Sequence, residues 1–225
     1  FIGLFVVKPE HRGQGIGRRL WQHALKTLSS VQCIGLEAAV QMVDFYERAG
    51  FQKDCITTRR QMLFRSEASL DASPSQRSDV AVVPLHEVSL EAIQRYDERH
   101  EISPRPHFLE LWLRHRAGDV FAARDAEGEC HGYVRIRPCL LPIGEGWRVG
   151  PWLAEDPGMA SLLLNNALDH HNGVVLIDTP GHNPSAKTIL SARGFKPMTS
   201  TVRMYKGVIP KGHDRNVYGL ACLEL

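Results

Sequence analysis

V-K-P-E-H-R-G-Q-G-I-G-R, residues 7–18, is the stretch of this chain that decides its fold. The apolar residues 1–7 lead into it and are expected to form a strand, and residues 16–28 after it have the apolar spacing of a helix. Glycines at alternate positions between them allow a tight turn with no Cβ to hold off a bulky ligand. Because the first N–H groups of a helix are unpaired and carry partial positive charge, this arrangement predicts a phosphate or pyrophosphate site.

The spacing of the glycines narrows the choice of ligand. A dinucleotide-binding loop reads G-x-G-x-x-G and a nucleoside triphosphate loop ends in G-K-[ST], whereas this loop reads G-x-G-x-G. The string Arg12-x-x-Gly15-x-Gly17, three residues after Pro9, resembles motif A of the GCN5-related N-acetyltransferases, the GNAT family. The resemblance implies acetyl-coenzyme A as co-substrate, with its pyrophosphate on the loop amides and its pantetheine beside the backbone of residues 6 and 7. The implied cofactor-binding residues are Phe5, Val6, Val7, Arg12, Gly13, Gln14, Gly15, Ile16, Gly17 and Arg18. A glycine turn without a ligand is the alternative.

A second motif lies downstream, where Tyr46-Glu47-Arg48-Ala49-Gly50-Phe51 resembles the family's Y-x-x-x-G-F signature. Gly50 is placed to end a short helix in the left-handed conformation. In the family the tyrosine hydroxyl can protonate the departing coenzyme A thiolate, and a phenol with a pKa of about 10 suits a thiolate with a pKa of about 8.5. The resemblance therefore makes Tyr46 the candidate general acid, and an amphipathic core tyrosine is the alternative.

The candidate general base is Glu37, at the end of a short apolar stretch, residues 33–38, that is expected to be a buried strand. Some family members use a glutamate at this place to relay a proton from the substrate amine, directly or through water. A solvated strand-end charge is an equally open interpretation. Many members also carry an asparagine about seven residues before the tyrosine, and Ala39 stands there in this chain, which puts one cofactor contact in doubt.

The rest of the chain predicts a second copy of the same mixed α/β plan. We expect the C-terminal half of one GNAT domain in residues 1–65, a small polar linker in residues 66–79, and a complete GNAT-like domain in residues 80–225, each with a mixed sheet flanked by helices. The strands expected in addition to those above are residues 56–64, 80–83, 120–123, 132–137, 147–152, 174–178 and 217–225, and the further helices are residues 90–96, 108–115, 159–170 and 183–193.

The second half resembles the C-terminal domain of tandem acetyltransferases of the YitH type, through G-P-W-L-A at residues 150–154 and R-G-F at residues 193–195. It departs from the catalytic pattern at two points. Its loop contains Glu155 and Asp156 where a phosphate would bind, and carboxylates repel a pyrophosphate. Leu190 stands at the tyrosine position. We therefore expect a degenerate copy that shapes the substrate pocket or the interdomain surface, with a purely structural partner as the alternative.

Composition excludes several classes of function. A net charge of +2 over 225 residues provides no basic field for nucleic acid, and no apolar run is long enough to span a membrane. Five scattered cysteines and eleven histidines without paired spacings predict neither a disulfide framework nor a metal site, and they suit a reducing, cytoplasmic compartment.

The resemblance thus implies an enzyme that transfers acetyl from acetyl-coenzyme A to an amine, small-molecule or peptide, by direct attack. The chain begins at Phe1 within the first expected strand, and the elements that the family places before it are missing. We expect an N-terminally truncated form that binds coenzyme A poorly and has little activity. The alternatives are a coenzyme A-binding sensor without turnover and a nonfunctional fragment. No sequence pattern indicates the acceptor amine, the acyl chain length or the oligomeric state.

Overall fold

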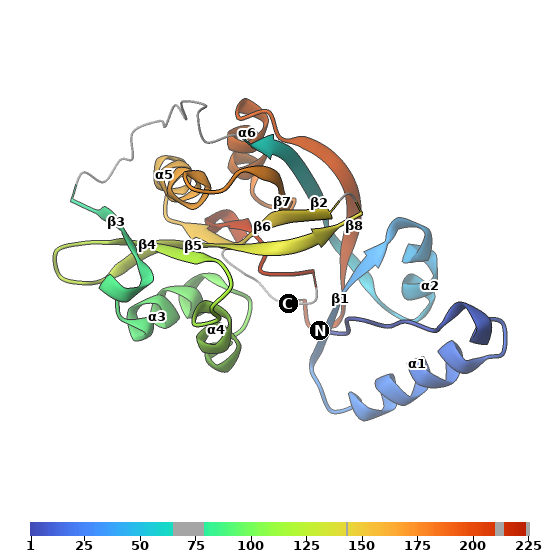
Figure 1. Ribbon diagram of the computed structural model, residues 1–225. Helices are drawn as coiled ribbons and strands as arrows, with labels where there is room; N and C mark the ends of the chain where they lie inside the picture. The colour runs from blue at the N-terminus through green and yellow to red at the C-terminus, as the bar shows by residue number, and fades with distance from the viewer. Residues whose placement is uncertain (65–78, 143, 210–213, 224–225) are drawn as a thin grey trace. The chain divides into compact units, whose positions relative to one another are not determined.

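The computed structural model describes residues 1–64, 79–142, 144–209 and 214–223 (Figure 1). They form two compact units. The first unit contains residues 1–55, 201–210 and 223–225, and the second contains residues 56–200 and 211–222. The linker expected at residues 66–79 lies outside the described residues except for Asp79, so the division into domains at residues 65 and 80 stays a prediction.

The first unit is a small α/β layer that carries the glycine loop. Its elements are the 3-10 turn η1 (Pro9–His11), α1 (Ile16–Thr27), β1 (Cys33–Ala39), η2 (Val40–Met42), α2 (Val43–Arg48), the start of β2 (Gln52–Phe64) and the end of β8 (Lys196–Gly207). β1 pairs antiparallel with β8, from Cys33 opposite Gly207 to Ala39 opposite Thr201. The helix predicted at residues 16–28 and the strand predicted at residues 33–38 are thereby confirmed.

Trp21 of α1 is the centre of this unit's core. Alternate residues of β1 face it, as the two-residue repeat of a strand requires. The buried members of the cluster are Trp21, Ile34, Leu36, Ala38, Val43, Phe51 and Met204. The rings of Phe5, Phe45, Tyr46 and Phe51 lie 5.4–5.9 Å from the Trp21 ring, so the core holds the N-terminal segment, α1 and α2 together.

The strand expected over residues 1–7 is not formed, and that prediction was wrong. Ile2 donates its N–H to the Gly35 carbonyl at 2.8 Å, but Leu4 has a φ of 53° and breaks the extended conformation. The Leu4 and Val6 side chains are 86% and 71% exposed. Apolar residues alone do not make a strand, because a strand also needs a continuous hydrogen-bonding partner.

The second unit is a mixed sheet between two pairs of helices. Its strand order is β2-β7-β6-β5-β4-β3, and β9 pairs with β6. The elements are β3 (Ala81–Pro84), η3 (Leu85–Glu87), α3 (Leu90–His100), α4 (Pro106–Leu113), β4 (Asp119–Arg124), β5 (Cys130–Leu141), β6 (Gly144–Ala154), α5 (Pro157–Leu168), β7 (Gly173–Thr179), α6 (Pro184–Ala192), η4 (Asp214–Asn216) and β9 (Val217–Gly219). β6 and β7 are parallel, whereas β2 with β7, β3 with β4, β4 with β5, β5 with β6 and β6 with β9 pair antiparallel.

The helices of the second unit cover both faces of its sheet. α5 and α6 lie on one face, and α3 and α4 lie on the other (Figure 1). α5 is buried on nearly all sides, with Met159, Leu163 and Leu164 at 0–1% exposure, because it packs against β4, β5 and β6. The α/β plan expected for this half is confirmed, although β9 is much shorter than the predicted strand 217–225 and β8 was not predicted.

Candidate functional site

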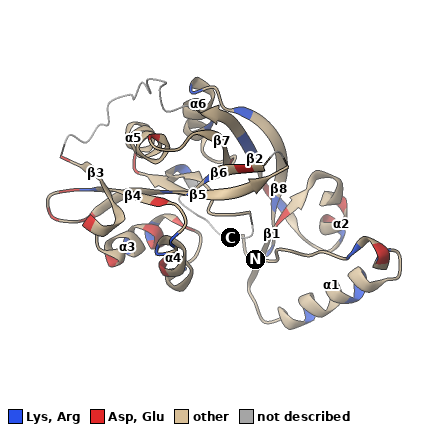
Figure 2. Ribbon diagram, in the orientation of Figure 1, with Lys and Arg blue, Asp and Glu red and all other residues tan. Residues whose placement is uncertain are grey.

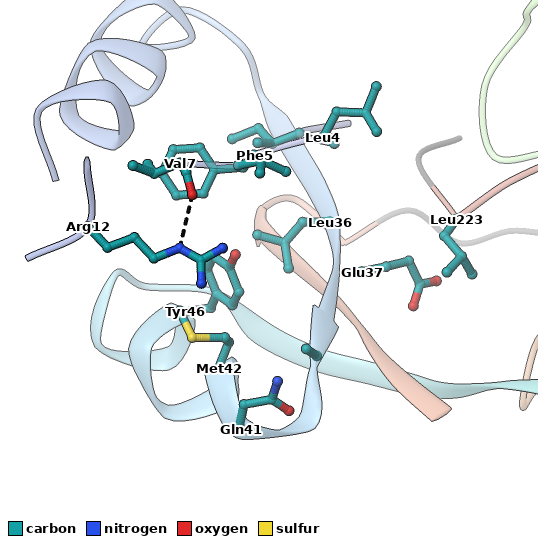
Figure 3. A pocket seen from close by; sticks show the side chains of 14 residues that line it. Leu4, Phe5, Val7, Arg12, Leu36, Glu37, Gln41, Met42, Tyr46 and Leu223 are labelled. Atoms are coloured by element: carbon teal, nitrogen blue, oxygen red, sulfur yellow. Dashed lines mark hydrogen bonds between the residues drawn. The ribbon is translucent and has the colours of Figure 1, made fainter. Parts of the chain in front are cut away.

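A cavity of about 540 Å³ lies beside the glycine loop within the first unit (Figure 3). Three segments form its wall: the N-terminal stretch, the end of β1 with the following 3-10 turn, and α2. The lining residues are Ile2, Gly3, Leu4, Phe5, Val6, Val7, Arg12, Leu36, Glu37, Ala39, Gln41, Met42, Tyr46 and Leu223. The cavity therefore brings Phe5, Val6, Val7 and Arg12 of the predicted cofactor site together with both predicted catalytic residues.

The glycine loop has the backbone that the sequence predicted. Gly13 and Gly15 have φ angles of 75° and 74°, in the left-handed region that favours glycine, and a Cβ at either position would meet nothing within 4 Å. Gly15 is the N-cap residue of α1 and makes no side-chain cap. The loop thus turns directly into the helix with open space above it.

The amides of this loop are available to a ligand. His11 and Arg12 donate their N–H groups to Lys8 and Pro9, and the next backbone donor along the chain is Arg19, which bonds to Gly15. Among the described residues, no backbone carbonyl accepts from the N–H groups of residues 13–18. Unpaired N–H groups at a helix N-terminus make an anion site.

Side chains around the loop strengthen its positive character. Arg12 donates its Nε to the Val7 carbonyl at 2.9 Å and so lies across the cavity wall (Figure 3). Gln14 donates its amide to the Glu10 carbonyl at 3.1 Å, which braces the loop. α1 contains the exposed Arg18 and Arg19 in its first turn and no acidic residue (Figure 2). Residues 13–18 do not line the 540 Å³ cavity themselves. They begin the helix beside it.

Tyr46 reaches the cavity from α2. It is half-buried, and its ring packs edge-on against Trp21 at 5.4 Å and Phe51 at 6.0 Å. Burial raises the pKa of the Tyr46 phenol, so the hydroxyl keeps its proton at neutral pH. A neutral phenol at the wall of the cavity can donate a proton to a leaving group there.

Glu37 also lines the cavity, but its carboxylate is held by two partners from β8. Thr201 donates its hydroxyl to Oε2 at 2.6 Å, and Arg203 donates its Nε to Oε1 at 2.7 Å. The Glu37 and Arg203 side chains are only 4% and 6% exposed. Burial opposes the charge of Arg203, but the Glu37 carboxylate beside it raises the pKa of this guanidinium overall. Glu37 is thus a paired carboxylate, and Figure 3 shows it directed away from Tyr46.

Sequence reasoning missed the contribution of β8 to this site. The stretch T-V-R-M at residues 201–204 alternates polar and apolar residues, which is the signal that could have predicted the strand. Gln41, Met42 and Leu223 were also missed, and no local pattern marks them as cavity residues. Ala39, which stands where many members have an asparagine, lines the cavity with only a methyl group.

The corresponding loop of the second unit is closed by its own side chains. Asp156 accepts the N–H of Met159 at 2.8 Å and caps α5, and Glu155 bonds to His131 at 2.8 Å. Leu190, at the tyrosine position, is fully buried. A carboxylate therefore occupies the helix N-terminus where a phosphate would bind.

None of the helices in the described part of the chain has both the length and the apolar composition of a membrane span.

Comparisons with known proteins identify the family of the chain. Two family models, each described as an acetyltransferase (GNAT) domain, match residues 1–62 and residues 93–219. Among curated proteins, a holothin acyltransferase of Pseudoalteromonas sp. (strain SANK 73390) is 26% identical over 227 residues, covering 100% of this chain and 72% of that protein. An uncharacterised protein of Caenorhabditis elegans is 27% identical over 116 residues, covering 51% of this chain and 37% of that protein.

Solved structures share the fold. A Pyrococcus horikoshii protein assigned as an acetyltransferase superposes with a TM-score of 0.75 at 22% identity, over 98% of this chain and 70% of its own. A tandem GNAT protein from the clavulanic acid biosynthesis pathway superposes with a TM-score of 0.60 at 17% identity, over 92% of this chain and 74% of its own. At these identities the likeness concerns the fold alone.

Proposed function

The chain belongs to the acetyltransferase (GNAT) family of acyltransferase enzymes, and on this basis we propose that it transfers an acetyl group from acetyl-coenzyme A to an amine. One observation carries the proposal. The N–H groups of residues 13–18 have no backbone acceptor among the described residues, and they lie at the N-terminus of α1 beside a cavity of about 540 Å³. A pyrophosphate matches that charge and geometry.

Different residues of the first unit would bind different parts of acetyl-coenzyme A. The loop residues Gly13 to Gly17 would hold the pyrophosphate through their amides, with Arg12 and Arg18 adding charge-assisted hydrogen bonds. Phe5, Val6 and Val7 would offer backbone groups to the pantetheine arm, which has alternating amide donors and acceptors. The irregular backbone of residues 1–8 supports this role, because its polar groups are not consumed by a continuous strand pairing.

The chemistry proposed is direct attack. The amine nitrogen forms a bond to the thioester carbonyl carbon, the carbon–sulfur bond breaks, and the sulfur takes the proton of the Tyr46 hydroxyl, which regains one from solvent. The proton released by the amine leaves toward Glu37 through water. Because both carboxylate oxygens of Glu37 already accept hydrogen bonds from Thr201 and Arg203, its proposed role is to orient that water, which carries the proton to solvent.

The second unit is proposed to be a degenerate copy that shapes the acceptor side. Asp156 at the N-terminus of α5 and Leu190 in place of a tyrosine support this assignment.

The scattered cysteines favour a reducing compartment, and we propose that the protein is cytoplasmic.

The test measures release of the coenzyme A thiol by the protein, with acetyl-coenzyme A and a panel of primary amines. Holothin joins the panel because it is named in the 26% identical relative. Thiol release that depends on one amine, with a product heavier by one acetyl group, supports the proposal. Tight coenzyme A binding without release with any amine would favour a sensor instead, and neither binding nor release would contradict both.

A further inference from the structure

A second cavity, of about 470 Å³, lies within the second unit between α4 and the end of β5. It is independent of the coenzyme A site. Its lining residues are Phe108, Leu111, Trp112, His115, Ala117, Arg135, Arg137 and Pro138. The volume falls in the range of small-molecule sites, and the lining combines apolar walls with a few convergent polar groups, as such sites do.

Two arginines of β5, Arg135 and Arg137, line this cavity, and no acidic side chain is among its lining residues. The Asp178 carboxylate acts on the charge of Arg137 from outside the lining. Arg135 is only 2% exposed, and its one protein acceptor is the Ala117 carbonyl, at 2.8 Å from Nη2. Arg137 contacts the Pro138 carbonyl at 3.5 Å. Among the described residues no acidic side chain forms an ion pair with either, and the Nε of each is buried without a hydrogen-bond partner. Buried charges in proteins are normally paired, so the buried guanidinium of Arg135 lacks an anion, and the half-buried Arg137 lies beside it.

Trp112 partly compensates for the missing anion. The Arg135 and Arg137 guanidinium carbons lie 4.9 and 5.0 Å from the centre of its ring, within cation–π distance. This contact does not neutralise the charges. Burial, followed by the charge of Arg137, lowers the pKa of Arg135 to about 10, which is the sign of a cation kept in an unfavourable environment.

The apolar rim indicates the rest of the ligand. The ring centres of Phe108 and Trp112 are 5.1 Å apart. Leu111 also lines the cavity and is 77% exposed, so an apolar side chain at this rim is in contact with solvent. An inorganic anion would bond to the guanidinium groups and leave these side chains in water. A carboxylate on an apolar body satisfies both, because a carboxylate pairs with the planar guanidinium through two parallel hydrogen bonds.

We propose that this cavity is a binding site for an organic carboxylate, with the carboxylate on Arg135 and Arg137 and its apolar body against Phe108, Leu111 and Pro138. Nothing in the proposed acetyl transfer requires this site. The proposal therefore stands or fails separately from that reaction.

The experiment is a titration of residues 1–225 with 3-phenylpropionate, followed by the indole N–H signals in proton–nitrogen NMR and by calorimetry. The chain has four tryptophans, and the Trp112→Phe variant identifies the signal of Trp112. Matched probes are 3-phenylpropanamide, which lacks the charge, and inorganic phosphate, which lacks the apolar body. The Arg135→Met and Arg137→Met variants keep the volume and remove the charge. Arg114→Met is the control. Arg114 lies at the end of α4, the helix that contains Trp112, but its side chain is 64% exposed and paired with Glu110.

We expect one molecule of 3-phenylpropionate per chain, a shift of the Trp112 signal, and weaker binding of the amide and of phosphate. Arg135→Met and Arg137→Met should each weaken binding about tenfold or more, and Arg114→Met should not. The thermal unfolding of each variant verifies folding, and Arg137→Met decides the matter if Arg135→Met is unfolded. No binding by the unaltered chain, equal binding of the amide, preference for phosphate, or binding unchanged by Arg137→Met would each overturn the proposal.

Discussion

Arg203 and Glu37 are 166 positions apart in the chain, yet the guanidinium Nε of Arg203 donates to the Glu37 carboxylate at 2.7 Å. Both side chains are more than nine-tenths buried. The pair ties β1 to β8 at the position of the candidate general base, so the stability of the first unit and the orientation of the Glu37 carboxylate both depend on this contact.

Arg203→Met should destabilise the protein by about 3–5 kcal/mol, because it leaves a buried carboxylate without its cation. Urea unfolding measures the loss. Arg95→Met is the control, since Arg95 pairs with Glu129 at 2.6 Å with both side chains about half exposed, and a surface pair contributes about 0–1 kcal/mol. The double variant Glu37→Met/Arg203→Met should recover part of the loss. Equal effects of Arg203→Met and Arg95→Met would contradict this account of the pair.

Tyr46→Phe should lower kcat for thiol release by about a hundredfold or more, with little change in coenzyme A affinity, because it removes the proposed proton donor and keeps the ring. Tyr218→Phe, in β9 of the second unit, controls for the loss of a phenol hydroxyl elsewhere. An unchanged kcat in Tyr46→Phe would remove Tyr46 from the mechanism.

The pH dependence of kcat follows from the direction of the Tyr46 shift. Burial raises the pKa of Tyr46 above its ordinary value of 10.0, so the acid form is the one present at neutral pH and it is lost only as pH rises through the raised value. We expect no decline of kcat attributable to this group below pH 10.0. A steady-state profile that differs between the unaltered protein and Tyr46→Phe near neutral pH would disagree with the assignment.

Gly15→Ala and Gly128→Ala separate backbone strain from ligand binding. The φ angles are 74° and 89°, and an added Cβ meets nothing within 4 Å in either place, so each substitution should cost about 1–3 kcal/mol by strain alone. Only Gly15→Ala should weaken acetyl-coenzyme A binding, because only there would the methyl group face the pyrophosphate. Calorimetry with both variants checks this, and a similar loss of affinity in the two would count against the loop as the anion site.

The second unit should become less stable at acid pH, because protonation of Asp125 removes a stabilising contact. The hydrogen bond with His131, at 2.7 Å, lowers the pKa of Asp125, and the N–H of Glu129 acts in the same direction. Since the folded pKa lies below the ordinary value of 3.8, the stabilisation is present above that value and is lost as pH falls through the folded pKa. Urea midpoints should therefore fall more for the unaltered protein than for Asp125→Asn between neutral and strongly acid pH. Parallel curves would show that the contact contributes nothing.

Elements with a local signal were predictable from the sequence. The helix after the glycine loop, the Ser89 cap of α3, which accepts the Ala92 N–H at 3.1 Å, and the turn at residues 125–128 all follow from neighbouring residues. β8 was not predicted although residues 201–204 alternate polar and apolar side chains, and its register against β1 has no local signal because the partners are more than 160 positions away. The same distance in sequence hid the pairing of Glu37. His171 shows the same limit: it is 6% exposed and lies 3.1 Å from the Asp119 carboxylate, a partner that no neighbouring residue indicates.

The most direct test of the central claim follows the backbone amide signals of Gly13, Gly15 and Gly17 in proton–nitrogen NMR while acetyl-coenzyme A is added to the protein. Amides that bind a pyrophosphate should shift strongly, and coenzyme A should shift them as much as its acetyl ester, while the amide of Gly128 stays in place. Binding of acetyl-coenzyme A with these three signals unmoved, or no binding at all, would contradict the assignment of the loop.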